Sequence, residues 1–169
     1  MSGARFTLEQ INRFSREEFA RVFGGVFENS AWIADAAWAC RPFHDFDALH
    51  NAFCEQVRRA PEGRQLDLIR AHPDLVGKAT LTAESHREQA QAGLGQLSAS
   101  EIALFQKYNS DYREKFGFPF VICARLNKKD AILAGFERRM NHAVGEERKT
   151  ALEEIFKIAE LRLRDLLIL

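Results

Sequence analysis

Apolar side chains recur along this chain at spacings of three and four residues, which is the period of a helix with one buried face. Phe19 to Phe27 shows this period near the start of the chain, and Leu152 to Leu163 shows it near the end. Capping-box sequences, in which Ser or Thr is followed three residues later by Glu or Gln, predict where helices begin. Their first residues are Thr7, Ser15 and Ser98. The pattern therefore predicts a helical protein.

Proline and glycine breaks divide the pattern into about eight or nine helices. Two short helices open the chain, and the others are expected at 31–40, 46–61, 65–70, 81–92, 98–117, 130–142 and 146–168. Phe118 to Ala124 is strand-like, but it contains Pro119 and has no second run to pair with. We therefore expect one extended connector in the core of an all-α bundle.

Composition narrows the class of protein. The chain has 169 residues, of which 46% are hydrophobic and 28% charged, so we expect one compact globular domain over 1–169. Lys plus Arg equals Asp plus Glu at 24 each, and this zero net charge argues against nucleic acid or an anionic membrane as a partner. No apolar run approaches the ~18 residues that a membrane span needs.

The cysteines and the most metal-like motif do not suggest a disulfide framework or a metal centre. Cys40, Cys54 and Cys123 are odd in number and far apart, which favours a reducing compartment, the cytoplasm. The string His44 to Asp47 contains metal-ligand residue types, but a metal site needs three or four convergent ligands. We therefore expect no metal centre.

One of the five histidines stands in an unusual context. His72 precedes Pro73, and Gly77 follows four residues later, so the imidazole is expected at the start of a constrained loop. It is a candidate catalytic group, with a helix-capping histidine as the alternative. Structural roles in turns or at helix ends are the favoured interpretation of His44, His50 and His142.

Polar residues within two predicted helices are the other candidates. Ser85, Glu88 and Gln89 have spacings of three and four, so they share one helix face, which is either functional or simply solvated. Arg162 lies beside the apolar stripe of the last helix. It either extends its stem to solvent or is a buried cation that recognises a carboxylate through two parallel hydrogen bonds.

Four blocks of sequence, taken together, resemble a known family. They are His72 to Leu75, Ser85 to Leu94, Lys115 to Ile122, and Arg162-Leu163. In this order and spacing they are similar to the 2-oxo-4-hydroxy-4-carboxy-5-ureidoimidazoline (OHCU) decarboxylases of purine catabolism, over residues 14 to about 166. The resemblance implies an all-helical, cofactor-free enzyme that converts this small-molecule ureide to (S)-allantoin during urate degradation. It also suggests a homodimer.

The resemblance assigns roles by position. It implies His72 as the catalytic histidine and Glu88 as the carboxylate that orients it. Substrate contacts are implied for Pro73, Ser85, Gln89, Phe120, Val121, Ile122, Cys123, Ala124 and Arg162.

Two other functions are compatible with the residues alone. A helical interaction module without catalysis would use the many aromatic side chains at an interface, although it would not need the polar set around His72. A lyase or isomerase acting on a related ureide is the second alternative. Relatives from animals and plants often end in a peroxisomal signal, whereas this chain ends Leu-Ile-Leu, which favours a cytoplasmic, bacterial-type enzyme.

Overall fold

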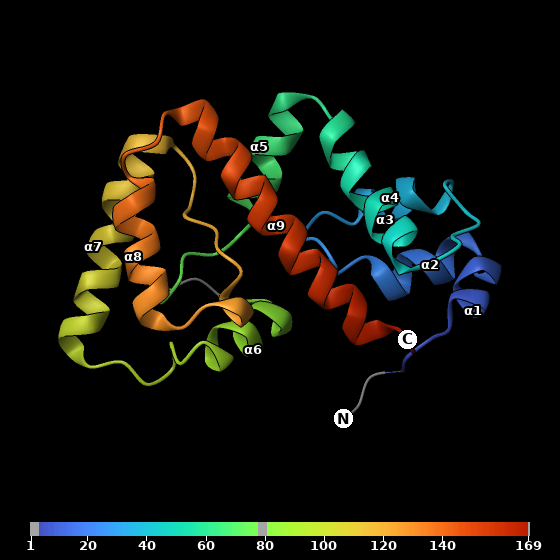
Figure 1. Ribbon diagram of the computed structural model, residues 1–169, viewed down its shortest axis with the longest axis horizontal. Coiled ribbons are helices and arrows are strands. Elements are labelled where there is room, and N and C mark those ends of the chain that lie inside the picture. Colours follow the sequence, from blue (N-terminus) through green and yellow to red (C-terminus); the bar gives the residue numbers. More distant parts are fainter. Residues whose placement is uncertain (1–3, 78–80, 169) are drawn as a thin grey trace. The chain divides into compact units, whose positions relative to one another are not determined.

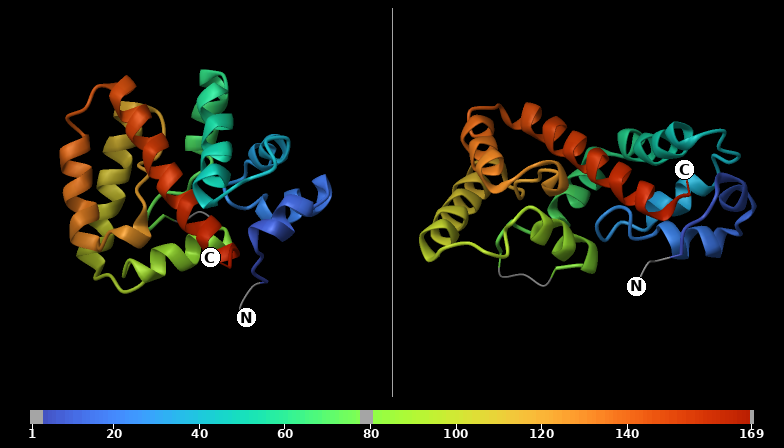
Figure 2. Two further views of the ribbon diagram at one scale, coloured as in Figure 1. Left: turned by 45° about the vertical axis from the view of Figure 1, so that its right-hand side comes forward. Right: turned by 60° about the horizontal axis from the view of Figure 1, so that its bottom comes forward.

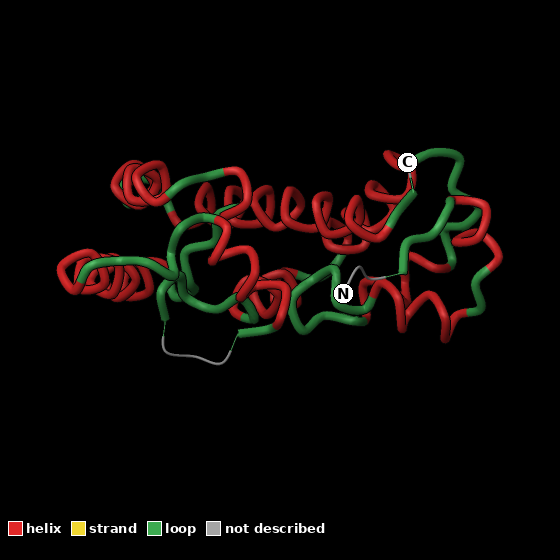
Figure 3. The backbone as a smooth tube through the Cα atoms, turned by 90° about the horizontal axis from the view of Figure 1, so that it is seen from below, coloured by secondary structure: helices red, strands yellow, loops and turns green. Residues whose placement is uncertain are grey.

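A computed structural model describes residues 4–77 and 81–168 of the chain, and Figures 1 and 3 show only helices and loops in this part. Its elements are α1 (Leu8–Arg13), α2 (Arg16–Phe23), α3 (Trp32–Trp38), α4 (Phe46–Arg59), α5 (Glu62–Arg70), α6 (Ala83–Gln91), α7 (Ala99–Phe116), the 3₁₀ turn η1 (Ala124–Leu126), α8 (Lys129–Arg139) and α9 (Val144–Leu166). The predicted all-α class is confirmed. None of the described helices is long and apolar enough to cross a membrane.

The residues group into two compact units, and each is described by itself. Unit 1 comprises Met1–Leu68 and Phe156–Leu169, and unit 2 comprises Ile69–Ile155. Helices α5 and α9 each contribute residues to both units. The expectation of a single domain over 1–169 stays a prediction.

Local signals placed most helix ends correctly. The capping boxes at Thr7, Ser15 and Ser98 all form, so each side-chain oxygen accepts a hydrogen bond from the backbone amide three residues on. Gly117 has φ 77° after α7, and Gly93 has φ 82° just after α6, which is the left-handed conformation that glycine adopts without strain.

Most of the other boundaries differ from the prediction by one to three residues, and two of the differences have a local cause. Helix α5 begins at Glu62 rather than Gln65, because the Pro61 carbonyl accepts hydrogen bonds from the amides of Arg64 and Gln65. Proline has no amide hydrogen, so it leaves no unpaired donor at the start of a helix. The extended connector stops at Cys123, because Ala124 already belongs to η1.

The core of unit 1 is built on phenylalanine. Phe19 and Phe23 from α2 pack against Phe53 from α4, with ring centroids 5.8 and 6.0 Å apart. Phe27 also stacks on Phe53, with ring centroids 6.1 Å apart. All four rings are almost completely buried.

In unit 2, α7 and α8 lie side by side and run in the same direction, because the connector returns between their ends (Figures 1 and 2). Phe120 of the connector stacks on Phe136 of α8 at a centroid separation of 3.8 Å, and Tyr112 of α7 meets Phe120 edge-on at 5.3 Å. A Cβ atom on Gly135 would lie 3.4 Å from Phe120, in van der Waals contact, so this face of α8 packs directly against the connector. The connector is therefore a core element, as predicted.

Candidate active site

His72 lies in the turn that follows α5, in unit 2. Its side chain is buried, with 6% exposed, and its backbone amide donates to the Ile69 carbonyl at 3.1 Å. Pro73 follows and disfavours continuation of the helix. The imidazole thus lies at the start of the loop, as the sequence predicts, and it is buried.

The loop after Pro73 is tightly held. The Gly77 amide donates to the Asp74 carbonyl at 3.3 Å, which closes a turn with Val76 at its third position. Val76 has φ 56°, a left-handed conformation that a β-branched residue rarely adopts. A Cβ atom on Gly77 would lie 3.0 Å from the Cβ of Asp74 and 3.1 Å from its carbonyl oxygen, so a side chain there would force the turn to shift.

Side chains from α6 and α7 hold this loop in place. The Val76 amide donates to Gln89 Oε1 at 3.1 Å, and Gln89 Nε2 lies 3.5 Å from the Asp74 carbonyl oxygen. From α7, Asn109 Nδ2 donates to the Leu75 carbonyl at 2.7 Å. The loop next to His72 is therefore fixed by amide side chains rather than by secondary structure, which sustains the strained turn.

The polar face predicted on α6 points into unit 2. Ser85 and Gln89 are buried and Glu88 is half-buried, whereas His86 and Arg87 between them are exposed. The helix packs beside η1, which follows the connector. This burial excludes the alternative of a merely solvated face for these side chains.

The connector has its own polar supports. The Cys123 amide donates to Glu154 Oε2 at 2.8 Å, and the Cys123 carbonyl accepts from Asn127 Nδ2 at 3.0 Å. Burial raises the pKa of the Cys123 thiol to about 11, with smaller contributions in the same direction from the carboxylates of Glu154 and Glu88. The thiol is therefore protonated near neutral pH, and Glu88 lies close enough to the connector to affect it.

Arg162 lies in unit 1, on the α9 segment that belongs to this unit. Its side chain is 6% exposed, and Nη1 is 3.1 Å from Glu28 Oε2, with the carbonyls of Gly25 and Val26 at 3.3 and 3.4 Å. Arg162 is therefore a buried cation rather than a side chain that extends to solvent. Its carboxylate partner Glu28 is 2% exposed, and no motif in the sequence marked it.

His50, His142 and the three cysteines lie in surroundings that are typical of structural residues. His50 Nε2 lies 2.9 Å from the Phe156 carbonyl oxygen, and His142 Nδ1 lies 2.8 Å from Glu147 Oε2. Cys40, Cys54 and Cys123 are free thiols, and the first is exposed. Within residues 4–77 and 81–168, no group of three or more His, Cys, Asp or Glu side chains could hold a metal ion.

Comparison with known proteins shows the family of the chain. The family model described as OHCU decarboxylase matches residues 12–164. This chain belongs to the OHCU decarboxylase family. It is 45% identical to the 2-oxo-4-hydroxy-4-carboxy-5-ureidoimidazoline decarboxylase of Haloferax volcanii over 159 residues, which cover 94% of this chain and 95% of the relative.

Solved structures of the OHCU decarboxylase family share the fold. A crystal structure of OHCU decarboxylase in the presence of (S)-allantoin matches with a TM-score of 0.71 and 25% identity, over 90% of this chain and 98% of that one. A crystal structure of (S)-allantoin synthase matches with a TM-score of 0.80 and 28% identity over 96% of this chain. This chain spans about half of that longer protein, 54% of its length.

For this OHCU decarboxylase family member, unit 2 brings together most of the residues predicted for the site. His72, Pro73, the α6 face and the connector all belong to it, and Arg162 belongs to unit 1. Sequence reasoning missed the supporting side chains, among them Asn109, Glu154 and Glu28. Asn109 occupies a position within the apolar period of α7, between Phe105 and Tyr112 on the buried face, and a polar residue at such a position is the signal that could have drawn attention to it.

Proposed function

We propose that this protein decarboxylates OHCU and releases (S)-allantoin, in the degradation of urate. The observation that carries the proposal is the burial of His72 and the α6 polar face in a protein whose family membership is established over residues 12–164. A buried histidine beside buried hydroxyl and amide groups suits a small polar substrate. An interface for another protein would not require these groups to be hidden.

The chemistry needs no external electron acceptor. The substrate carbon that bears the carboxylate neighbours a ring C=N bond, so the electron pair of the breaking C–C bond moves into the ring as CO2 departs. The electrons of the C=N bond pass to the ring nitrogen, which takes up a proton, so the first product is an enol. One proton delivered to the ureido-bearing carbon, with loss of the proton of the hydroxyl group, then gives the ketone form, allantoin. The protein has to orient the carboxylate and deliver this proton to one face only.

His72 is proposed to deliver that proton. An imidazole gains and loses a proton near neutral pH, which is the property required of a general acid here. Glu88 is proposed to orient the ring and select its tautomer, as carboxylates do for histidine in other enzymes. The inward position of Glu88 on α6 supports this role, because the carboxylate lies on the same face as Ser85 and Gln89.

The remaining residues are proposed to hold the ureide. Ser85 offers a hydroxyl, and Gln89 has a second amide hydrogen beyond the one directed at Asp74. In the segment Val121 to Ala124, the Cys123 amide already donates to Glu154, so a substrate would use other backbone groups of this segment. Phe120 and Pro73 would line the sides of the binding site. Arg162, whose guanidinium has five donors, would bind a carbonyl or carboxylate of the substrate.

The test uses OHCU that is generated enzymatically in the assay mixture. Urate oxidase and hydroxyisourate hydrolase generate OHCU from urate, the protein is added, and circular dichroism follows the optical activity of (S)-allantoin. We expect faster and single-handed allantoin formation compared with the mixture that lacks this protein. Racemic product at the uncatalysed rate would refute the proposal.

We also propose that the protein acts as a homodimer in the cytoplasm. Family resemblance supports the dimer, and free thiols at Cys54 and Cys123 within the core support a reducing compartment. Light scattering after size-exclusion chromatography tests the oligomeric state, and a monomer at micromolar concentration would refute the dimer.

A further inference from the structure

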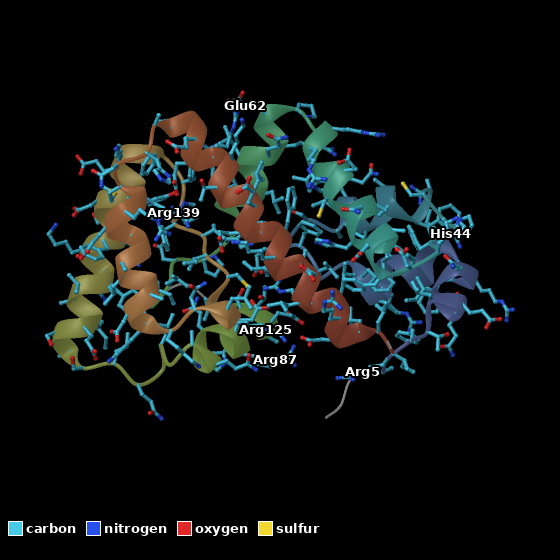
Figure 4. The ribbon with its side chains drawn as sticks, in the orientation of Figure 1. Arg5, His44, Glu62, Arg87, Arg125 and Arg139 are labelled. Carbon is cyan, nitrogen blue, oxygen red and sulfur yellow. The ribbon has the colours of Figure 1, made fainter. Side chains whose placement is uncertain are left out.

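A cluster of buried polar side chains in unit 2 contacts the connector but includes none of the residues predicted for the site. Arg139 of α8 is 2% exposed, Glu147 of α9 is 0% exposed, and Tyr112 of α7 is 0% exposed. His142, in the turn between α8 and α9, completes the group through Glu147. Figure 4 labels Arg139 where α8 faces the connector. We call these four residues the Arg139 cluster.

The guanidinium of Arg139 joins two partners. Its Nε donates to Glu147 Oε1 at 2.6 Å, and Nη2 lies 2.5 Å from the same oxygen in ion-pair contact. Its Nη1 donates to the carbonyl of Val121 at 2.7 Å, and its Cζ lies 4.2 Å from the centroid of the Phe120 ring. Arg139 thus contacts two successive residues of the connector, one through its backbone and one through its ring.

Both carboxylate oxygens of Glu147 have hydrogen-bond partners. Its Oε1 also accepts the hydroxyl of Tyr112, and its Oε2 is 2.8 Å from His142 Nδ1. Burial and the Glu147 carboxylate raise the pKa of Tyr112, so its hydroxyl keeps its proton and donates. Three helices therefore hold one guanidinium in one orientation.

A buried ion pair is an expensive way to stabilise a core. Two charges lose their hydration, and apolar side chains of similar volume often stabilise a fold as well or better. This ion pair also serves the connector, because its arginine donates a hydrogen bond to the connector backbone, which an apolar side chain could not do. Phe118 to Cys123 is buried yet extended, so its backbone carbonyls and amides need partners that a helix would have supplied internally.

We propose that Arg139, held by Glu147, is a positioning residue for catalysis, because it sets the backbone of Phe120 to Cys123 in the conformation that binds the substrate. This inference rests on the proposed function, in which the connector supplies substrate contacts. Arg139 acts on the connector through the Val121 carbonyl and the Phe120 ring.

The test compares three variants with the wild-type protein. Arg139→Lys keeps the charge but loses the fork that serves two partners at once. Arg139→Met combined with Glu147→Gln leaves no uncompensated buried charge and keeps a polar partner for Tyr112, so this protein should fold. Arg138→Lys is the matched control, because Arg138 precedes Arg139 on the same helix and is exposed.

Three measurements are made on each protein: steady-state turnover of OHCU, calorimetric affinity for (S)-allantoin, and hydrogen exchange of the connector amides. We expect both altered Arg139 proteins to raise KM and the Kd for allantoin about tenfold, with a smaller change in kcat, because loss of a positioned hydrogen-bonding backbone weakens ground-state and transition-state binding together. Connector amides should exchange at least about tenfold faster in these proteins. Arg138→Lys should match the wild type.

The outcomes separate the two proposals. A folded Arg139→Met, Glu147→Gln protein with wild-type KM, allantoin affinity and connector exchange would overturn the positioning role while leaving the proposed function intact. If that protein fails to fold, Arg139→Lys decides by the same three measurements. A wild-type protein without turnover would refute the proposed function, and unchanged connector exchange in the Arg139 variants would then refute the positioning of the backbone as well.

Discussion

Replacing Gln89 with leucine should loosen the loop next to His72 and lower both stability and activity. Gln89 Oε1 accepts the Val76 amide at 3.1 Å, and this amide belongs to a residue held at φ 56°. Leucine has nearly the same volume, so the change removes the polar end of the side chain without opening a cavity. The effect therefore reports the hydrogen bond rather than packing.

The magnitude follows from this contact. A buried amide that loses its acceptor costs about 1–3 kcal/mol, and half-burial of Val76 places the expected loss in free energy of unfolding near the lower end, about 1–2 kcal/mol. A left-handed conformation costs an L-residue about 1–2 kcal/mol, so without Gln89 the turn should relax. Displacement of the loop that begins at His72 should lower kcat/KM at least about tenfold, because misplacement by about 1 Å can cost about 10²-fold.

Urea unfolding and the allantoin assay measure the two effects. Gln91→Leu is the matched control, since Gln91 is an exposed residue at the end of the same helix and its substitution should change stability by less than about 0.5 kcal/mol. If Gln89→Leu equals Gln91→Leu in stability and in kcat/KM, the loop is not held by Gln89 and this reasoning fails.

Three further predictions concern the proposed site and the thiols. His72→Asn should lower kcat by about 10² to 10⁴ with an unchanged melting temperature, whereas the same change at exposed His86 should have no effect; comparable kcat values would contradict the assignment. Arg162→Lys should weaken calorimetric binding of (S)-allantoin, because an ammonium cannot form two parallel hydrogen bonds, and wild-type affinity would argue against a substrate contact. Burial raises the pKa of Cys123 to about 11, above its ordinary value of 9.0, so the folded state binds this proton more tightly. The free energy of unfolding should then be unaffected by this thiol below pH 9 and should fall between about pH 9 and 11. At pH 8 a thiol reagent should label only Cys40 in the folded protein, and rapid labelling of Cys123 would refute its burial.

Much of the secondary structure could be predicted from the sequence because it depends on neighbours along the chain. Capping boxes at Thr7, Ser15 and Ser98 and the glycine after α7 involve residues within a few positions of one another, so their effect is local. The same locality explains why the face of Ser85, Glu88 and Gln89 could be recognised. The family resemblance, too, was carried by short contiguous blocks.

Whether that face was buried could not be decided from the helix alone, because a polar face at helical spacing suits solvent as well as a site. The tertiary structure decided it by packing α6 beside η1. It also decided the interpretation of Arg162, whose partner Glu28 lies 134 residues away in sequence. The Val121 carbonyl and the Cys123 amide find their partners, Arg139 and Glu154, on two separate helices for the same reason, since an extended, buried segment has to find its hydrogen bonds elsewhere in the fold. The sequence by itself thus determined the helices and the family, and only three-dimensional packing determined which polar groups are buried and which other groups hold them.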